Sequence, residues 1–229
     1  SLTDGLLETS ARRVTQYVYN GDYGSNKVKF GAYYGGSSKR NIKNVDLKNN
    51  RKNTWGTGLI FNHEIDSIQN VTVAAGFTRQ ISENANKTAY YSNAYALGLA
   101  YNFVHTTYGL DLAHKDTKNK GGAGNKVKNN EVTAVIRQGL NEDWNVYAMY
   151  SYKTEKTLPA GSAYSKSTDR QFLVGTEYYV FKQGSVKVKP FIEWQATRTK
   201  YENTFDKDSG KQLDRSRDFK TVIGLRAYW

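Results

Sequence analysis

The stretch that decides the fold is Phe219-Lys220-Thr221-Val222-Ile223-Gly224-Leu225-Arg226-Ala227-Tyr228-Trp229. Its odd-numbered positions are apolar or small, and they are Phe219, Thr221, Ile223, Leu225, Ala227 and Trp229. Its even-numbered positions include both cations of the stretch, and they are Lys220, Val222, Gly224, Arg226 and Tyr228. An alternation with a period of two predicts a β-strand that has two different faces. If the same alternation recurs along the chain, the whole fold is built from strands of this kind.

The same alternation recurs along the chain from residue 27 onward. Apolar side chains occupy every second position in the segments 27–34, 55–62, 71–78, 94–103, 108–113, 132–137, 144–153, 171–180 and 186–195. Residues 1–20 are ambiguous, because apolar residues there have helical spacing while residues 14–19 also alternate as a strand would. The helical stripe would be Leu7, Ala11, Val14 and Val18. The sequence therefore predicts an all-β fold of consecutive amphipathic strands.

The connections between these segments alternate in length. Short ones lie near 63–67, 104–106, 140–143 and 182–185, and long ones lie near 35–53, 82–91, 116–130, 156–169 and 201–214. Outer-membrane barrels combine short periplasmic turns with long extracellular loops in this way. Aromatic residues also gather near the strand ends, as the two interfaces of a membrane would require, and they are Trp55, Tyr95, Phe103, Trp144, Tyr152, Trp194 and Trp229. These regularities predict a closed antiparallel transmembrane β-barrel.

The number of strands depends on residues 1–20. A barrel with both ends in the periplasm needs an even number of strands, but eleven segments alternate if residues 12–20 are included. Residues 1–20 are therefore expected to supply either the first strand or strands of the wall, or a helix inside the lumen. Residues 21–229 are predicted to form the barrel, with about ten to twelve strands; twelve is preferred because strands of about 9–11 residues fit the chain length.

Composition argues against several other classes of protein. The chain has no cysteine, and its histidines His63, His105 and His114 have no adjacent nucleophile that would indicate a catalytic pair. No run of 18 apolar residues predicts a transmembrane helix. The net charge of +12 is compatible with nucleic acid, but no recognition helix or RNP-like motif accompanies it. We therefore expect no enzyme activity, no metal, no cofactor and no nucleic-acid partner.

Function is expected on the polar face of the strands, which would line the lumen. Its basic residues are Lys27, Lys29, Arg137, Lys153, Lys187, Lys189, Lys220 and Arg226. Its acidic residues are Asp111, Glu131, Glu177 and Glu193. An excess of basic side chains in a pore with low-dielectric walls attracts anions. The alternative interpretation is that the acids pair with these cations and only rigidify the wall.

The same face is rich in small residues, which are Gly31, Gly56, Gly58, Ala74, Gly76, Ala94, Ala96, Gly98, Ala100, Gly109, Ala113, Gly139 and Gly175. Glycine in a strand either relieves crowding where the wall bends or leaves room in the lumen for water, solute or a plug. The sequence leaves both interpretations open.

Two of the predicted long loops are basic. One contains Lys39, Arg40, Lys43, Lys48, Arg51 and Lys52, and the other contains Lys118, Lys120, Lys126 and Lys128. Such runs are most often solvated surface. Against an outer leaflet rich in phosphate they would also hold lipopolysaccharide or guide anionic solutes to the pore.

With these features the chain resembles bacterial outer-membrane β-barrels over residues 12–229. The most specific match is Ile223-Gly224-Leu225-Arg226-Ala227-Tyr228-Trp229, which is similar to the C-terminal strand, ending in Phe or Trp, of those proteins. The resemblance implies an assembly signal read by the barrel-assembly machinery, and its residues would be Phe219, Thr221, Ile223, Leu225, Ala227 and Trp229.

In size, basic lumen and strand number the chain is similar to the small monomeric porins for acidic sugars, the oligogalacturonate- and sialic-acid-type channels. That resemblance implies a monomeric porin in the outer membrane of a Gram-negative bacterium, surrounded by the lipid bilayer and lipopolysaccharide. Such a channel passes small anionic solutes by passive diffusion. One alternative is an autotransporter-type translocator domain with its N-terminal segment in the pore. A second alternative is a surface adhesin or lipopolysaccharide-binding barrel.

Overall fold

The structure is a computed structural model that describes residues 14–37, 49–84, 89–119, 126–158, 164–184, 186–203 and 212–228. Within them lie twelve β-strands. They are β1 (Val14–Tyr23), β2 (Asn26–Gly35), β3 (Asn49–Asp66), β4 (Gln69–Asn84), β5 (Ala89–Phe103), β6 (Thr106–Asn119), β7 (Lys126–Gly139), β8 (Trp144–Leu158), β9 (Ser165–Tyr178), β10 (Phe181–Gln183), β11 (Val186–Asn203) and β12 (Gln212–Tyr228). None of the described residues forms a helix long and apolar enough to cross a membrane.

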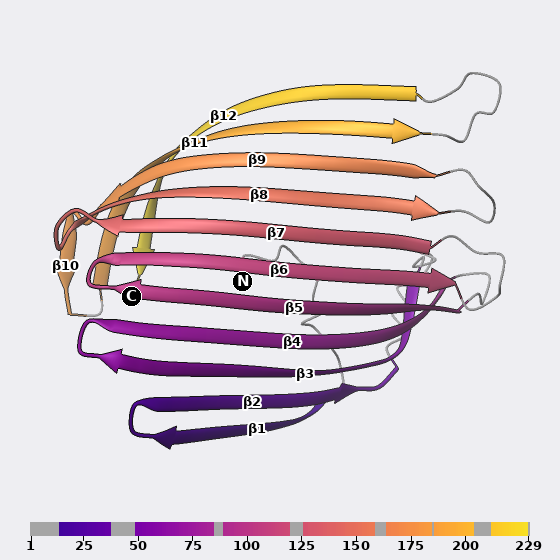
Figure 1. The fold of residues 1–229 in the computed structure, drawn as a ribbon, viewed down its shortest axis with the longest axis horizontal. Coiled ribbons are helices and arrows are strands. Elements are labelled where there is room, and N and C mark those ends of the chain that lie inside the picture. The colour runs from indigo at the N-terminus through magenta and orange to yellow at the C-terminus, as the bar shows by residue number, and fades with distance from the viewer. Residues whose placement is uncertain are drawn as a thin grey trace.

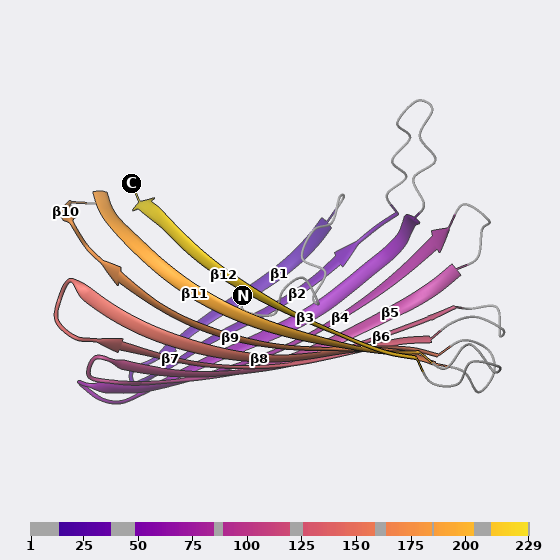
Figure 2. The ribbon, with the colours of Figure 1, turned by 90° about the horizontal axis from the view of Figure 1, so that it is seen from above.

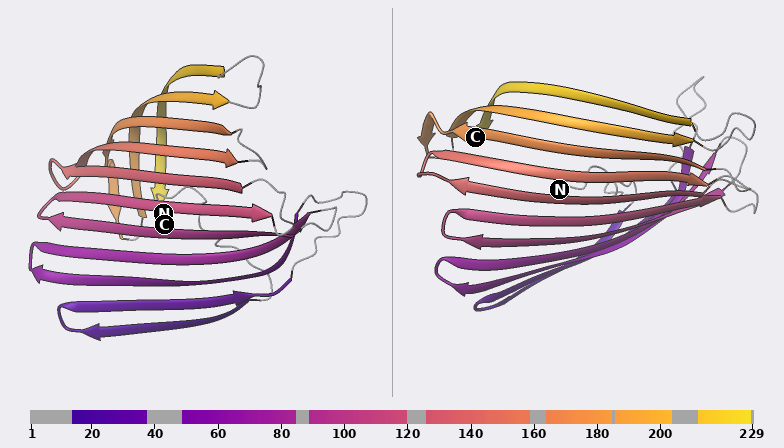
Figure 3. Two further views of the ribbon diagram at one scale, coloured as in Figure 1. Left: turned by 45° about the vertical axis from the view of Figure 1, so that its right-hand side comes forward. Right: turned by 45° about the horizontal axis from the view of Figure 1, so that its top comes forward.

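All the strands belong to one antiparallel sheet in which neighbours in sequence are neighbours in space (Figure 1). The sheet is strongly twisted and curved, so that it has a concave and a convex face (Figures 2 and 3). Its two outermost full-length strands are β1 and β12. The predicted all-β, antiparallel architecture is therefore confirmed.

The short strand β10 continues the path of β9. Both pair with β11, with Glu177 of β9 opposite Phe191 and Phe181 of β10 opposite Val188. The two registers differ by one residue, which indicates a bulge between Tyr178 and Phe181. If β9 and β10 are counted together as one strand path, eleven strand paths cross the sheet from end to end. This number equals the number of alternating segments in the sequence.

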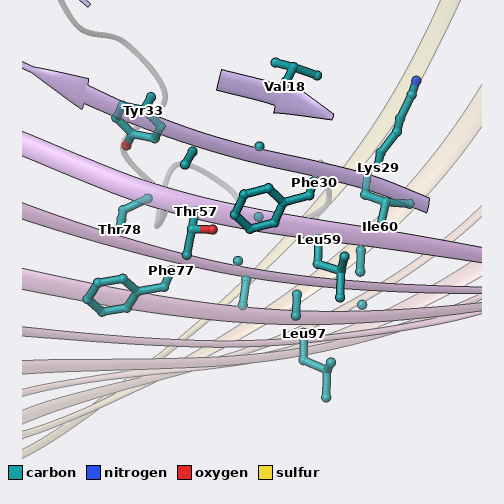
Figure 4. A pocket seen from close by; sticks show the side chains of 18 of the residues that line it. Val18, Lys29, Phe30, Tyr33, Thr57, Leu59, Ile60, Phe77, Thr78 and Leu97 are labelled. Atoms are coloured by element: carbon teal, nitrogen blue, oxygen red, sulfur yellow. The ribbon is translucent and has the colours of Figure 1, made fainter. Parts of the chain in front are cut away.

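The alternation in sequence becomes a difference between the two faces. On β12 the odd-numbered residues Phe219, Ile223 and Leu225 are 64 %, 77 % and 64 % exposed on the convex face. Figure 4 shows the same division on the other half of the sheet, where Lys29 and Leu97 point to opposite sides. A convex face of exposed Leu, Ile, Phe and Trp side chains is the surface that a lipid-facing wall requires.

Several strands extend further into the predicted loops than the apolar pattern indicated. Lys118 lies in β6, while Lys126 and Lys128 lie in β7, although the sequence suggested a loop over 116–130. Ladder hydrogen bonds join backbone groups and need no apolar side chains, so the pairing continues where the pattern stops. Other cations of the predicted basic loops, including Lys39, Arg40, Lys43, Lys48 and Lys120, lie outside the described residues.

The N-terminal segment is described from residue 14 onward. Val14 and Val18 lie in β1, and β1 pairs with β2 along its whole length, from Val14 opposite Gly35 to Tyr23 opposite Asn26. Residues 14–20 are therefore wall. Residues 1–13, with Leu7 and Ala11 of the proposed helical stripe, lie outside the described residues.

Aromatic rings cover some of the glycines on the concave face. A Cβ atom added to Gly56 would lie 2.7 Å from the Tyr33 ring and 2.8 Å from the Phe77 carbonyl oxygen. Two residues along β3, a Cβ atom on Gly58 would meet nothing closer than the Ala75 carbonyl oxygen at 3.7 Å. Glycine thus serves the packing of the wall at position 56, whereas position 58 has room for a methyl group in ordinary van der Waals contact.

This difference predicts unequal effects of one added methyl group. Gly56→Ala should destabilise the barrel by about 1–3 kcal/mol, because both the Tyr33 ring and the β4 backbone must move. Gly58→Ala, on the same strand and face, is the matched control and should be nearly neutral. Urea unfolding of the protein in lipid vesicles measures both, and equal destabilisation by the two variants would contradict this account of the glycines.

Candidate functional site

The register places every predicted pore-lining residue on the concave face. Directly paired residues of neighbouring strands share a face, and the pairing can be followed without a break from β2 to β12. For example, stepping from each residue to its direct cross-strand partner leads from Lys29 on β2 to Asp111 on β6 and then to Asp218 on β12. These three residues therefore share a face. The charged side chains predicted from the sequence therefore share one surface, although they do not all meet.

Six residues of five strands form a charge cluster near the short-turn end of β7–β12: Arg137, Tyr147, Glu177, Lys189, Glu193 and Arg226. Glu177 accepts hydrogen bonds from Arg137 Nη2 at 2.8 Å and Arg226 Nη1 at 3.0 Å, and Lys189 Nζ lies 2.8 Å from it. Glu193 accepts from Arg226 Nη2 at 2.7 Å and from the Tyr147 hydroxyl at 2.6 Å.

The register explains why these groups need one another. Lys189 and Arg226 are direct cross-strand partners, and like charges in such positions repel. Glu177 lies between them and bonds to both, which converts a repulsive pair into a network. The Arg226 guanidinium also lies over the Phe191 ring, 4.0 Å from its centroid. The cluster is thus internally satisfied, and its residues come from the five neighbouring strands β7, β8, β9, β11 and β12.

The cluster is layered, because its two guanidiniums are more exposed than its carboxylates and than Lys189, whose side chain is 8 % exposed. The Glu177 side chain is 4 % exposed, whereas those of Arg137 and Arg226 are 45 % and 37 % exposed. Lys153 and Glu131 repeat this order further along the wall, with 35 % and 4 % exposure and a separation of 3.5 Å. The concave surface here presents the two guanidiniums and the Lys153 ammonium, while the Glu177 and Glu131 carboxylates and the Lys189 ammonium are buried.

A second charged region lies toward the long-loop end of β8–β12. It is a hollow of about 330 Å³ lined by Ser151, Lys153, Asp169, Gln171, Gln195, Thr197, Thr199, Asp218 and Lys220. Lys220 pairs with Asp218 at 3.3 Å, and Thr199 donates a hydrogen bond to Asp169 at 2.6 Å. Charges of both signs line this hollow, so it is less cationic than the cluster.

The other half of the concave face carries mainly small side chains, and the larger ones that line its hollow include Lys29, Tyr33, Ile60 and Asp111. A hollow of about 830 Å³ lies over β1–β6, where Gly31 and Gly58 leave the backbone uncovered, whereas a Cβ atom on Gly98 would lie 2.8 Å from Asp111 Oδ1 (Figure 4). The concave face therefore combines an open, small-residue half with a charged half.

The remaining predicted lysines differ in their surroundings. Lys27 pairs with Glu64 at 3.0 Å, and both side chains are about half exposed. Among the described residues, no carboxylate lies within ion-pair distance of Lys29 or Lys187. Of the proposed assembly-signal residues, Phe219, Thr221, Ile223, Leu225 and Ala227 lie exposed on the convex face of β12, and Trp229 lies outside the described residues.

Sequence reasoning missed three contributors to this face. Tyr147 was not among the predicted lining residues, although its hydroxyl donates a hydrogen bond to Glu193. Asp169 lies in a segment that was expected to be a loop, Asp218 lies just before the predicted final strand, and both line the mixed hollow. The described residues contain no group of three or more potential metal ligands, and His114 Nε2 lies 3.2 Å from Asp116 in an ordinary surface contact.

No protein-family model matches this chain, and no curated protein matches it in sequence. Its fold is similar to that of OmpT, an outer membrane protein of Vibrio cholerae, with a TM-score of 0.60 at 16 % identity over 98 % of this chain and 67 % of OmpT. The trimer form of OmpT gives a TM-score of 0.58 at 13 % identity, covering 96 % of this chain and 65 % of OmpT. A variant of OmpT that lacks loop L8 gives 0.54 at 16 % identity, covering 94 % and 62 %.

The fold is that of a bacterial outer-membrane β-barrel, and it supports the predicted location in the outer membrane. The chain spans about two thirds of the length of the OmpT chains that it matches. At 13–16 % identity the likeness shows the architecture alone. The finer resemblance to acidic-sugar porins stays a prediction.

The layered cluster predicts which carboxylate matters for stability. Glu177→Gln should destabilise the barrel by about 3 kcal/mol, because three cations then lose their shared buried partner. Asp218→Asn removes an exposed carboxylate from the same face and should change stability by less than about 0.5 kcal/mol. Urea titration in lipid vesicles distinguishes them, and a Glu177→Gln variant as stable as Asp218→Asn would show that the cluster is not structural.

Proposed function

We propose that the chain forms a passive outer-membrane channel that prefers small acidic solutes, such as acidic sugars. The observation that carries this proposal is the layering of the charge cluster. Arg137 and Arg226 are exposed on the concave face, and the carboxylate that holds them, Glu177, is buried beneath. A solute that moves along this face meets cations first.

The chemistry of the exposed groups suits a carboxylate. Each guanidinium is planar and carries several N–H donors, which match the two oxygens of a carboxylate in a forked arrangement. Arg137 donates a hydrogen bond from Nη2 to Glu177. Arg226 donates one from Nη1 to Glu177 and one from Nη2 to Glu193. Both guanidiniums remain more than one third exposed and retain donors for a passing anion.

Weak attraction is what a diffusion channel requires. A pore conducts when a solute binds well enough to enter but not so well that it cannot leave. Here the buried carboxylates offset part of the cationic charge, and the mixed hollow near Lys153 and Asp218 has both signs. The wall therefore favours anions locally without forming a closed, high-affinity site. The proposal involves no covalent step and no cofactor.

Reversal potentials in planar bilayers with a salt gradient test this proposal. The unmodified channel should be anion-selective, because field lines are focused between low-dielectric walls. The double variant Arg137→Gln/Arg226→Gln leaves Glu177 and Glu193 with Lys189 alone, and its anion-to-cation permeability ratio should fall by at least about twofold.

The matched control is Arg198→Gln/Arg217→Gln, which removes the same charge from the convex face of β11 and β12. It should leave the permeability ratio unchanged. Cation preference in the unmodified channel, or no conductance at all, would overturn the proposal. Heat-modifiable migration on gels verifies that each variant has folded before its conductance is measured.

A further inference from the structure

Two rows of cations lie side by side on the convex face, near its long-loop end. The lysine row consists of Lys128, Lys156 and Lys166, which are direct cross-strand partners on β7, β8 and β9. The arginine row consists of Arg170, Arg198 and Arg217, which are direct partners on β9, β11 and β12. Between the rows, Lys200 lies opposite Arg215.

Such rows are unfavourable without a counter-charge. Side chains directly opposite on neighbouring antiparallel strands have Cβ atoms about 4.5–5.5 Å apart, and like charges there destabilise a sheet. Among the described residues, no carboxylate forms an ion pair with any member of the arginine row. The nearest acid on this face, Glu202, pairs with Lys200 at 2.6 Å. In the lysine row, Lys128 lies opposite Asp116 and Lys166 lies opposite Glu202, so the chain supplies part of the counter-charge there. The arginine row has no carboxylate in such a position and therefore forms a site for an anion that the described residues do not provide.

The arginine row lies at the edge of the lipid-facing band. Two residues from it toward the short turns, the same face carries Phe172 and Phe219, which are 43 % and 64 % exposed. The Phe219 ring stacks on Trp194 at 6.1 Å. Because apolar rings mark the membrane side of this boundary, the arginines lie at the depth of the lipid headgroups.

An apolar hollow continues from this boundary into the membrane side of the same strands. It has a volume of about 580 Å³, and its outward-facing lining includes Ile136, Val146, Ala148, Val174, Ile192 and Trp194. Trp194 is four residues from Arg198 on β11, or about 13 Å along the strand. One row of side chains, Tyr150, Phe172, Ala196 and Phe219, separates the arginine row from the hollow, which extends from there toward the short turns.

We propose that the two rows and the hollow form one binding site for a phosphorylated lipid of the outer leaflet. Its phosphate groups would be bound by the arginine row, where guanidiniums bind phosphate in forked pairs, with the lysine row beyond. An acyl chain would occupy the hollow between Ile136 and Trp194. The site is separate from the channel, because it lies on the opposite face of the same strands.

Thermal unfolding of the full chain in neutral detergent, with diphosphorylated lipid A as the added probe, tests the site. Lipid A should raise the unfolding temperature of the unmodified protein, and Arg170→Gln/Arg198→Gln/Arg217→Gln should weaken its apparent affinity at least about tenfold. Lys153→Gln/Lys187→Gln/Lys220→Gln removes as much charge from the concave face and should leave lipid A binding unchanged. Absence of lipid A binding in the unmodified protein, or equal losses in both triple variants, would overturn the proposal.

A second comparison separates a lipid from a free anion. Ala148→Phe fills the hollow without altering charge, and it should weaken binding of lipid A but not of inorganic tripolyphosphate. If tripolyphosphate binds as tightly as lipid A and Ala148→Phe has no effect on either, the rows are a simple anion site and the lipid proposal is wrong.

Discussion

In a bilayer every backbone N–H and C=O group must find its partner within the protein, and the rest of this structure follows from that constraint. The ladder is unbroken from β4 to β9 in every pairing. Among the described strands, irregularities lie at the ends of β3 and at the bulge between β9 and β10. A regular ladder keeps each side chain on one face, so the same strands can form a polar, water-facing surface and an apolar, lipid-facing surface.

The same constraint applies to the two edges of the sheet. β1 and β12 both run from the long-loop end to the short-turn end, so a direct pairing between them would be parallel. Antiparallel closure requires one further strand path between them, which agrees with the even number expected of such barrels. Free edges are not tolerated in lipid, and closure brings the charged half and the small-residue half of the concave face opposite each other.

The face of the sheet on which each charged residue of the alternating segments lies was predictable from the alternation of apolar and polar residues alone. The alternation assigned Lys29, Glu177 and Arg226 to the correct face, because parity survives as long as the ladder is regular. The sequence could not show that Arg226 bridges Glu177 and Glu193, since that depends on the register between strands that are distant in sequence. Nor could it orient Lys128, because the pairing of β7 extends beyond the apolar pattern into a stretch that resembled a loop.

The central claim is that neighbouring residues of one strand face water and lipid in turn. The chain has no cysteine, so single cysteines report their surroundings without background. Val222→Cys and Ile223→Cys, reconstituted in liposomes and treated with a charged, membrane-impermeant maleimide, test the claim most directly. The account predicts rapid labelling of Val222→Cys from the lumen and protection of Ile223→Cys by lipid. Equal labelling of both positions, or labelling of Ile223→Cys alone, would contradict it.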